Sequence, residues 1–188
     1  MRPFAAQPPE TRAAMAEWQI ERLNRSHERS RFSCGKPSLD DFIRALVSHY
    51  EQRNLGRFKV AVRPGETKLC GYYTLALGAV PFQNLPAPAA KKLPRHPVPT
   101  ILLARLAVHH SAQGQGLGEA LLLDALDRCS AMADGLGVHA VEVLALDASA
   151  KHFYEKYGFA PLLDAELHLF LSIATIRDAR RQHQMRLN

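Results

Sequence analysis

The spacing of apolar and polar positions predicts two long helices. Apolar residues recur at intervals of three and four from Leu39 to Tyr50, and the segment Ser38–Asp41 has the S-x-x-D pattern of a capping box at the start of this helix. The same period runs from Leu117 to Met132. Gly135 and Gly137 follow directly, so we expect the second helix to end there.

Apolar runs of strand length lie outside these helices. Arg63–Glu66 supplies turn residues between two of the runs, which predicts a β-hairpin. A short helix is expected after Asp147, a favourable N-cap, and before Gly158, whereas the proline-rich residues 78–99 are expected to form an irregular loop. The runs are Trp18–Leu23, Phe58–Val62, Leu69–Leu77, Ile101–Val108, Val138–Leu146 and Glu166–Ile176.

Length and composition favour one globular domain. The chain has 188 residues, of which 47% are apolar and 22% are charged. No apolar run is long enough to cross a membrane, and the N-terminal residues lack the continuous apolar core of a secretion signal, so we expect a cytoplasmic protein. We divide the chain into a flexible N-terminal tail (1–16), one domain (17–176) and a basic C-terminal tail (177–188).

The net charge of +6 points to an anionic partner, although a merely solvated basic surface has the same composition. The three cysteines have no CxxC spacing, which is typical of reduced thiols, and the nine histidines show no metal-ligand spacing, so we expect no metal site. The basic residues gather in three places: Arg22, Arg25, Arg29 and Arg31; Lys91, Lys92 and Arg95; and Arg177, Arg180, Arg181 and Arg186.

A glycine-rich turn separates the run Ile101–Val108 from the helix that follows it. Glycines let a ligand approach the backbone closely, and the first amides of a helix have no internal partner, so such a turn suits a phosphate or pyrophosphate. The glycine spacing fits neither the Walker A motif nor the dinucleotide fingerprint. A turn that only redirects the chain would have the same composition. The turn reads Gln113-Gly114-Gln115-Gly116-Leu117-Gly118.

The turn and the strand before it resemble the acyl-CoA signature of the GNAT acetyltransferase superfamily. The match is Q-x-x-G-x-G at Gln113, Gly116 and Gly118, after the strand Leu103–Val108, with a second signature at Phe153–Phe159. The resemblance implies an α/β fold: a single GNAT domain whose mixed, mostly antiparallel sheet is flanked by helices. It also implies acetyl-CoA as co-substrate, with its pyrophosphate on the turn and its pantetheine arm along the strand. The implied coenzyme-binding residues are Leu106, Ala107, Val108, Gln113, Gly114, Gln115, Gly116, Leu117 and Gly118.

A narrower resemblance, over about residues 30–175, is to the GNAT toxins of toxin–antitoxin pairs. Such toxins acetylate the α-amine of aminoacyl-tRNA, which blocks translation, and a ribbon-helix-helix antitoxin neutralises them. The resemblance therefore implies aminoacyl-tRNA and a cognate ribbon-helix-helix antitoxin as partners. One departure is His109-His110, where such toxins commonly have an Asp. The matching segments are Phe32-x-Cys34-Gly35, Leu39-Asp40, Gly71-Tyr72-Tyr73, Leu103–Val108, the glycine turn and Ala150-x-x-Phe153-Tyr154.

The same resemblance assigns the catalytic proton donor to Tyr154, which would protonate the departing thiolate. A tyrosine, with a reference pKa of about 10, stays protonated at neutral pH, but a packed aromatic on a helix would show the same pattern. No general base is evident, and His109 and His110 are the candidates. An α-amine titrates at about 7.7–8.0 and a lysine at about 10.4, so the lack of a clear base favours an aminoacyl ester as acceptor.

Two other functions remain open from the sequence. One is a GNAT enzyme that acetylates a protein lysine or a small amine. The other is a non-catalytic module that binds RNA or an antitoxin and keeps only the coenzyme-binding fold. The sequence does not determine the oligomeric state, for which a homodimer is one option.

Overall fold

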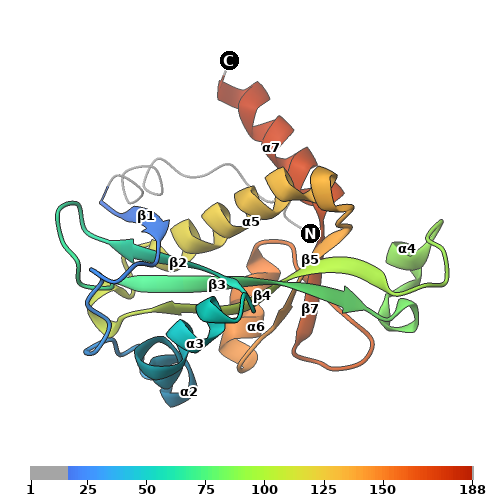
Figure 1. Ribbon diagram of the computed structural model, residues 1–188. Helices are drawn as coiled ribbons and strands as arrows, with labels where there is room; N and C mark the ends of the chain where they lie inside the picture. The colour runs from blue at the N-terminus through green and yellow to red at the C-terminus, as the bar shows by residue number, and fades with distance from the viewer. Residues whose placement is uncertain (1–16, 188) are drawn as a thin grey trace. The chain divides into compact units, whose positions relative to one another are not determined.

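The computed structural model describes residues 17–187, so the expected N-terminal tail (1–16) lies outside the described residues (Figure 1). The strands are β1 (Gln19–Arg22), β2 (Arg57–Val62), β3 (Gly71–Val80), β4 (Val98–Val108), β5 (Ala140–Leu144), β6 (Ala160–Pro161) and β7 (His168–Ser172). The α-helices are α2 (Pro37–Asp41), α3 (Val47–Gln52), α4 (Ala87–Ala90), α5 (Leu117–Leu136), α6 (Ala148–Lys156) and α7 (Ile173–Leu187). A π-helical turn, η1 (Phe42–Leu46), joins α2 to α3, and two 3-10 turns are η2 (Phe82–Asn84) and η3 (His110–Ala112).

The strands form one mixed sheet in the order β1-β2-β3-β4-β5-β7-β6. Strands β4 and β5 pair in parallel, with Thr100 opposite Ala140 and Leu102 opposite Glu142. The pairs β1–β2, β2–β3, β5–β7 and β6–β7 are antiparallel. The predicted α/β fold with a mixed, mostly antiparallel sheet and flanking helices is therefore confirmed, as is the hairpin of β2 and β3.

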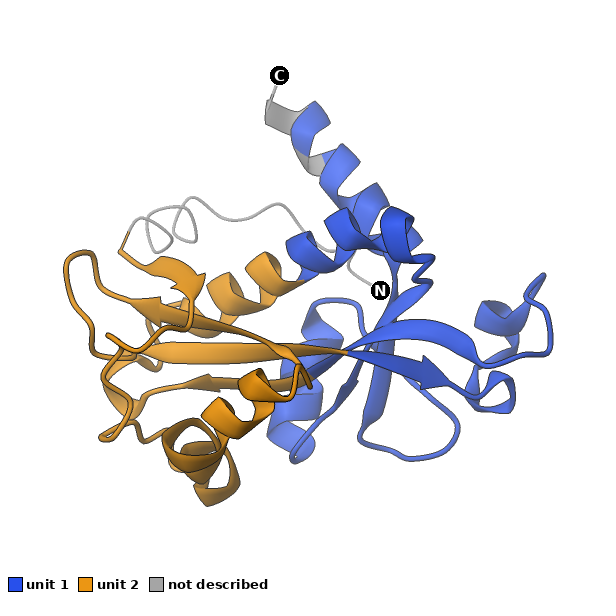
Figure 2. Ribbon diagram, in the orientation of Figure 1, with its two compact units in different colours: residues 1–6, 77–103, 126–188 blue, residues 7–76, 104–125 orange. Residues whose placement is uncertain are grey.

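The described chain divides into two compact units (Figure 2). Unit 1 comprises residues 77–103 and 126–187, and unit 2 comprises residues 17–76 and 104–125, so β3 and β4 each contribute to both. Each unit has its own apolar cluster. That of unit 2 includes Phe32, Phe42, Ile43, Phe58, Val60, Tyr72 and Ala107, and that of unit 1 includes Val80, Leu85, Val98, Ala140, Leu162 and Phe170.

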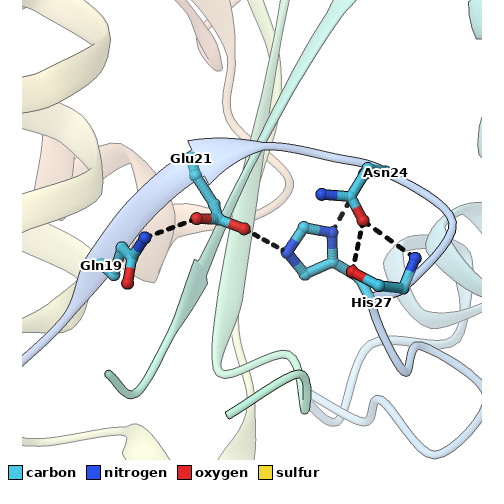
Figure 3. Close-up of polar contacts among 5 residues, drawn as sticks. Gln19, Glu21, Asn24 and His27 are labelled. Atoms are coloured by element: carbon cyan, nitrogen blue, oxygen red, sulfur yellow. Dashed lines mark hydrogen bonds and ion pairs between the residues drawn. The ribbon is translucent and has the colours of Figure 1, made fainter. Parts of the chain in front are cut away.

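A polar cluster around the buried His27 fixes the chain after β1 in unit 2 (Figure 3). The backbone N–H of Asn24 donates to Nδ1 of His27, at 3.0 Å, so the other ring nitrogen carries the proton. That nitrogen, Nε2, lies 2.8 Å from Oε1 of Glu21. Gln19 donates to the second carboxylate oxygen of Glu21, at 2.7 Å. Because His27 is buried, these bonds hold the loop that follows β1 against the strand.

The predicted capping box of the first helix is wrong. The helix begins two positions earlier than a Ser38 cap would place it, with Lys36 as N-cap and Pro37 at the first helical position, and no side chain caps it. Proline is well suited to this position because its missing N–H would be unpaired there in any case. The nearby carboxylate that bonds a backbone amide is that of Asp40, whose Oδ1 accepts from the N–H of Cys34 at 2.8 Å.

Other boundaries also differ from the predictions, among them the end of α5 and the start of α7. Gly135 lies within α5, and the helix ends before Gly137, which has φ +67°. Residues 173–176, predicted as strand, form the first turn of α7, where the hydroxyl of Ser172 accepts from the backbone N–H of Thr175 at 3.0 Å. A hydroxyl that satisfies an otherwise unpaired helix amide favours a helix start over a longer strand. Helix α7 then continues to Leu187.

Candidate functional site

The glycine turn presents open backbone at the start of a long helix in unit 2. Gly114 and Gly116 have φ values of +75° and +81°, a region that suits glycine, and both are exposed. A Cβ added at Gly114 would meet no atom within 4 Å. Helix α5 begins at Leu117 directly afterwards, so its unpaired first amides lie next to this open backbone. The arrangement fits a pyrophosphate, which glycine-exposed amides and a helix N-terminus favour.

Gln113 has a positioning role within the turn. Its side-chain Nε2 donates to the carbonyl oxygen of Val108, at 3.0 Å, and to that of Cys34, at 3.1 Å. The amide therefore ties the turn both to the end of β4 and to the loop before α2. Within the turn, Nε2 of Gln115 donates to the carbonyl of Ser111, at 2.9 Å, which fixes the second glutamine as well.

The other predicted coenzyme-binding residues lie at the end of strand β4 or at the start of helix α5. Ala107 and Leu117 are buried, whereas Leu106, Val108 and Gly118 are partly exposed. Gly71 allows β3 to pack closely on β4, because a Cβ at this position would lie 3.0 Å from the carbonyl oxygen of Ala107. The end of β4 and the start of α5 thus pack closely against β3.

A cation that the sequence analysis missed lies at this turn. The guanidinium of Arg63 donates to Oε1 of Gln115, at 3.4 Å, and lies 4.7 Å from the ring centroid of Trp18. These three residues are far apart in sequence, so no local pattern connects them. Arg63 is placed to add positive charge where a pyrophosphate would lie.

The two histidines after β4 lie side by side. Their ring centroids are 4.1 Å apart, and the chain turns at His110, the first residue of η3. Nδ1 of His109 accepts from the backbone N–H of Ser111, at 3.2 Å, and burial lowers the pKa of this histidine. Nδ1 of His110 lies 3.0 Å from the carbonyl oxygen of Ser33. Both rings therefore fix the backbone that leads into the turn.

Tyr154 lies in unit 1, on helix α6. As predicted, Asp147 caps this helix, since its carboxylate accepts from the N–H of Ala150 at 2.9 Å. Tyr154 is 6% exposed, and its ring centroid lies 5.2 Å from that of Phe153 and 5.5 Å from that of Phe159. Burial raises the pKa of the phenol, so the side chain holds its proton at neutral pH.

A chain of polar side chains crosses the sheet in unit 1, and the sequence analysis gave no sign of it. The hydroxyl of Thr100 on β4 donates to Glu142 on β5, and the other oxygen of Glu142 lies 2.9 Å from Nε2 of His168 on β7. Nδ1 of His168 lies 2.8 Å from a carboxylate oxygen of Asp164. Gly78 of β3 leaves the space for this chain, since a Cβ there would lie 2.1 Å from Oε1 of Glu142.

The described residues contain neither a membrane-spanning helix nor a metal site. Within residues 17–187, no helix is long and apolar enough to cross a membrane. In the same part of the chain, no three side chains of the kinds that bind metals gather as a metal site.

Comparison with known proteins agrees with these features. The profile of the acetyltransferase (GNAT) domain matches residues 77–161. A tRNA-acetylating toxin of Mycobacterium tuberculosis is 40% identical over 161 residues, which are 85% of this chain and 92% of the relative. The solved structure of AtaT complexed with acetyl-methionyl-tRNAfMet has a TM-score of 0.80 at 30% identity and covers 85% of this chain and 97% of its own. A mutant of AtaT bound to acetyl-CoA and the C-terminus of the antitoxin AtaR has a TM-score of 0.73 at 27% identity, with 86% and 96% covered.

The fold, the glycine turn and these similarities together define the class of protein: the chain belongs to the GNAT acetyltransferase family. It is an acetyl-CoA-dependent N-acetyltransferase. Within the family, the relatives described above place it close to toxins that acetylate tRNA. The open glycine turn at the start of α5 fits the coenzyme that this class uses.

Proposed function

We propose that this protein transfers the acetyl group of acetyl-CoA to the α-amine of aminoacyl-tRNA and thereby blocks translation. The observation that carries the proposal is the 40% identity to a tRNA-acetylating toxin over 85% of the chain. An N-acetylated aminoacyl group has no free amine with which to accept the growing peptide. A growth-arresting activity follows from that chemistry.

The glycine turn is the proposed site for the coenzyme pyrophosphate. The left-handed Gly114 and Gly116 and the first amides of α5 would hold its oxygens, and Arg63 would add a guanidinium. The pantetheine arm would run along Leu106–Val108, as in the family signature. Bound in this way, acetyl-CoA supplies a thioester whose carbonyl carbon is open to an amine.

Tyr154 is the proposed proton donor. The amine forms a C–N bond to the carbonyl carbon, the C–S bond breaks, and the phenol gives its proton to the departing sulfur. A buried phenol with a raised pKa is fully protonated before the reaction and regains its proton from solvent afterwards. A backbone N–H near Ala107–Val108 is the proposed donor to the negative charge that develops on the carbonyl oxygen.

The acceptor amine needs no strong base in this scheme. An α-amine has a reference pKa of about 7.7–8.0, so an appreciable fraction is neutral near pH 7. His109 is a poor candidate for a base because Nδ1 already accepts a backbone N–H and the ring is buried. The proton that the amine loses as the amide forms passes to solvent.

The proposal includes a partner and a compartment. AtaT is solved with the C-terminus of its antitoxin AtaR, and we propose an antitoxin of the ribbon-helix-helix class for this chain as well. Charged tRNA is used in the cytoplasm, where we propose that the protein acts.

The direct experiment offers the purified protein three acceptors: a set of charged tRNAs, the same tRNAs uncharged, and a lysine-containing peptide. Release of free CoA is measured with each acceptor. The proposal expects release with one or more charged tRNAs and none with the other two. Release with the peptide alone would instead identify a protein-lysine acetyltransferase. No release with any acceptor, while acetyl-CoA still binds, would favour a non-catalytic module.

A further inference from the structure

Arg105 of β4 lies on an aromatic surface in unit 2. Its guanidinium carbon is 3.6 Å from the ring centroid of Phe42 and 5.5 Å from that of Tyr50. Phe42 is itself 1% exposed and packs on Tyr50 and Tyr72, with ring centroids 5.1 Å and 6.3 Å away. The aromatic surface is therefore fixed by the core, and it holds the guanidinium in one orientation with its face covered.

The N–H edges of this guanidinium have no partner within the described chain. Across residues 17–187, the structure gives Arg105 neither an ion pair nor a hydrogen bond. Asp40, a buried carboxylate of the same unit, is already engaged by the N–H of Cys34 at 2.8 Å and the hydroxyl of Ser33 at 3.3 Å. Arg44, by contrast, donates to the carbonyl oxygen of Phe32. Arg105 is thus an oriented, partly exposed cation with its donors available.

The position of Arg105 along β4 indicates which anion it would meet. The residue directly precedes Leu106–Val108, the proposed pantetheine segment, and lies about 10 Å along the strand from Val108, away from the glycine turn. The coenzyme pyrophosphate would lie beyond the opposite end of that segment. Arg105 therefore lies toward the acetyl end, where the acceptor must approach. An acceptor carried on RNA brings phosphodiesters to this place.

We propose that Arg105 binds a backbone phosphodiester of the acceptor RNA near its aminoacylated end. The inference rests on the proposed function, because it assigns a residue to the RNA in that reaction. A planar guanidinium can donate two parallel N–H bonds to one phosphate, which lysine cannot match. Its aromatic support lowers the cost of ordering the side chain before the RNA arrives.

The test compares Arg105→Gln and Arg105→Lys with wild type, using a charged tRNA that wild type acetylates. Arg53→Gln is the matched control, because Arg53 is an exposed arginine of the same unit at the end of α3. Three quantities are measured: KM for the charged tRNA, KM for acetyl-CoA, and the rate with the methyl ester of the same amino acid, which carries no phosphate. Thermal unfolding of each variant reports the loss of packing on Phe42.

The expected result is a rise of about tenfold in the KM for charged tRNA with Arg105→Gln, since a charged hydrogen bond is lost. Arg105→Lys, which keeps the charge but not the fork, gives a smaller rise. The salt dependence of tRNA binding becomes less steep by about 0.7 in log–log slope, the value for one phosphate contact on a single strand. The KM for acetyl-CoA, the methyl-ester rate and the behaviour of Arg53→Gln stay at wild-type values.

Three outcomes would overturn the assignment. A rise in the KM for acetyl-CoA, and not in that for charged tRNA, would show that Arg105 binds the coenzyme. An equal loss of rate with the methyl ester would show that Arg105 positions the reacting groups and does not bind RNA. Unchanged kinetics in folded variants would leave it a structural stack on Phe42. If the wild-type protein acetylates no charged tRNA, the proposed function itself is wrong. The wild-type measurement alone decides this, independently of the Arg105 variants.

Discussion

Replacing Gly78 by alanine should destabilise the protein through a single clash. The added Cβ would lie 2.1 Å from Oε1 of Glu142 and 2.8 Å from the hydroxyl of Thr100, both of them buried. The carboxylate must move, and it then loses its bond from Thr100 and strains the one to His168. A hydrogen bond to a charged group contributes about 1.5–3 kcal/mol, so we expect a loss of about 2–4 kcal/mol in the free energy of unfolding.

For a chain of this size, such a loss lowers Tm by about 4–16 °C. The assay is thermal and urea unfolding of Gly78→Ala beside Gly135→Ala. Gly135 lies inside helix α5, and a Cβ there would meet nothing within 4 Å. The control should therefore be at least as stable as wild type, because alanine favours a helix over glycine by about 0.8–1 kcal/mol. A Gly78→Ala variant as stable as its control would refute the reasoning about the polar chain.

Two further predictions concern the coenzyme and pH. Gly116→Glu should abolish acetyl-CoA binding in calorimetry, because it adds a carboxylate where the pyrophosphate would lie. The control Gly65→Glu, at a hairpin glycine of similar φ (+80°), should bind acetyl-CoA normally. Equal loss of binding in both variants would show that backbone strain alone is responsible. Burial by itself lowers the pKa of His168, but hydrogen bonds to Asp164 and Glu142 outweigh it and raise the pKa. The protonated form thus stabilises the fold below about pH 6.5, and this contribution is lost as pH rises through the higher folded pKa. The Tm advantage of wild type over His168→Gln should therefore shrink as pH rises above about 6.5, and an advantage independent of pH would contradict the assignment.

Local sequence signals predicted the parts of the fold that neighbouring residues determine. The hairpin follows from the turn at Arg63–Glu66, helix α6 from the Asp147 cap, and the open turn from Gly114 and Gly116. The predicted capping box is wrong because Pro37 is the first helical residue, two positions before the start that a Ser38 cap would give. The pattern of small and polar residues alone does not distinguish these two starts.

Contacts between distant segments explain what the sequence analysis missed. Arg63 meets Gln115 across 52 positions of the chain, and Thr100 meets Glu142 across 42. No periodicity or spacing rule connects residues so far apart, since pairing of strands brings them together. The aromatic support of Arg105 is of the same kind, because Phe42 and Tyr50 come from the helical segment before the sheet hairpin. Motif spacing therefore gives no signal for contacts of this kind.

The most direct measurement of the central claim is CoA release on charged tRNA by wild type and Tyr154→Phe, paired with growth after induction of each. The substitution removes only the phenol oxygen, so ring packing on Phe153 and Phe159, stability and acetyl-CoA binding should be preserved. Loss of a general acid lowers a rate by about 10²–10⁴-fold. We expect wild type to acetylate charged tRNA and arrest growth, and the variant to bind acetyl-CoA, release CoA at least about a hundredfold more slowly and permit growth. A variant that acetylates charged tRNA and arrests growth as wild type does would show that Tyr154 is not the proton donor, and a wild type inactive on every charged tRNA would contradict the proposed function itself.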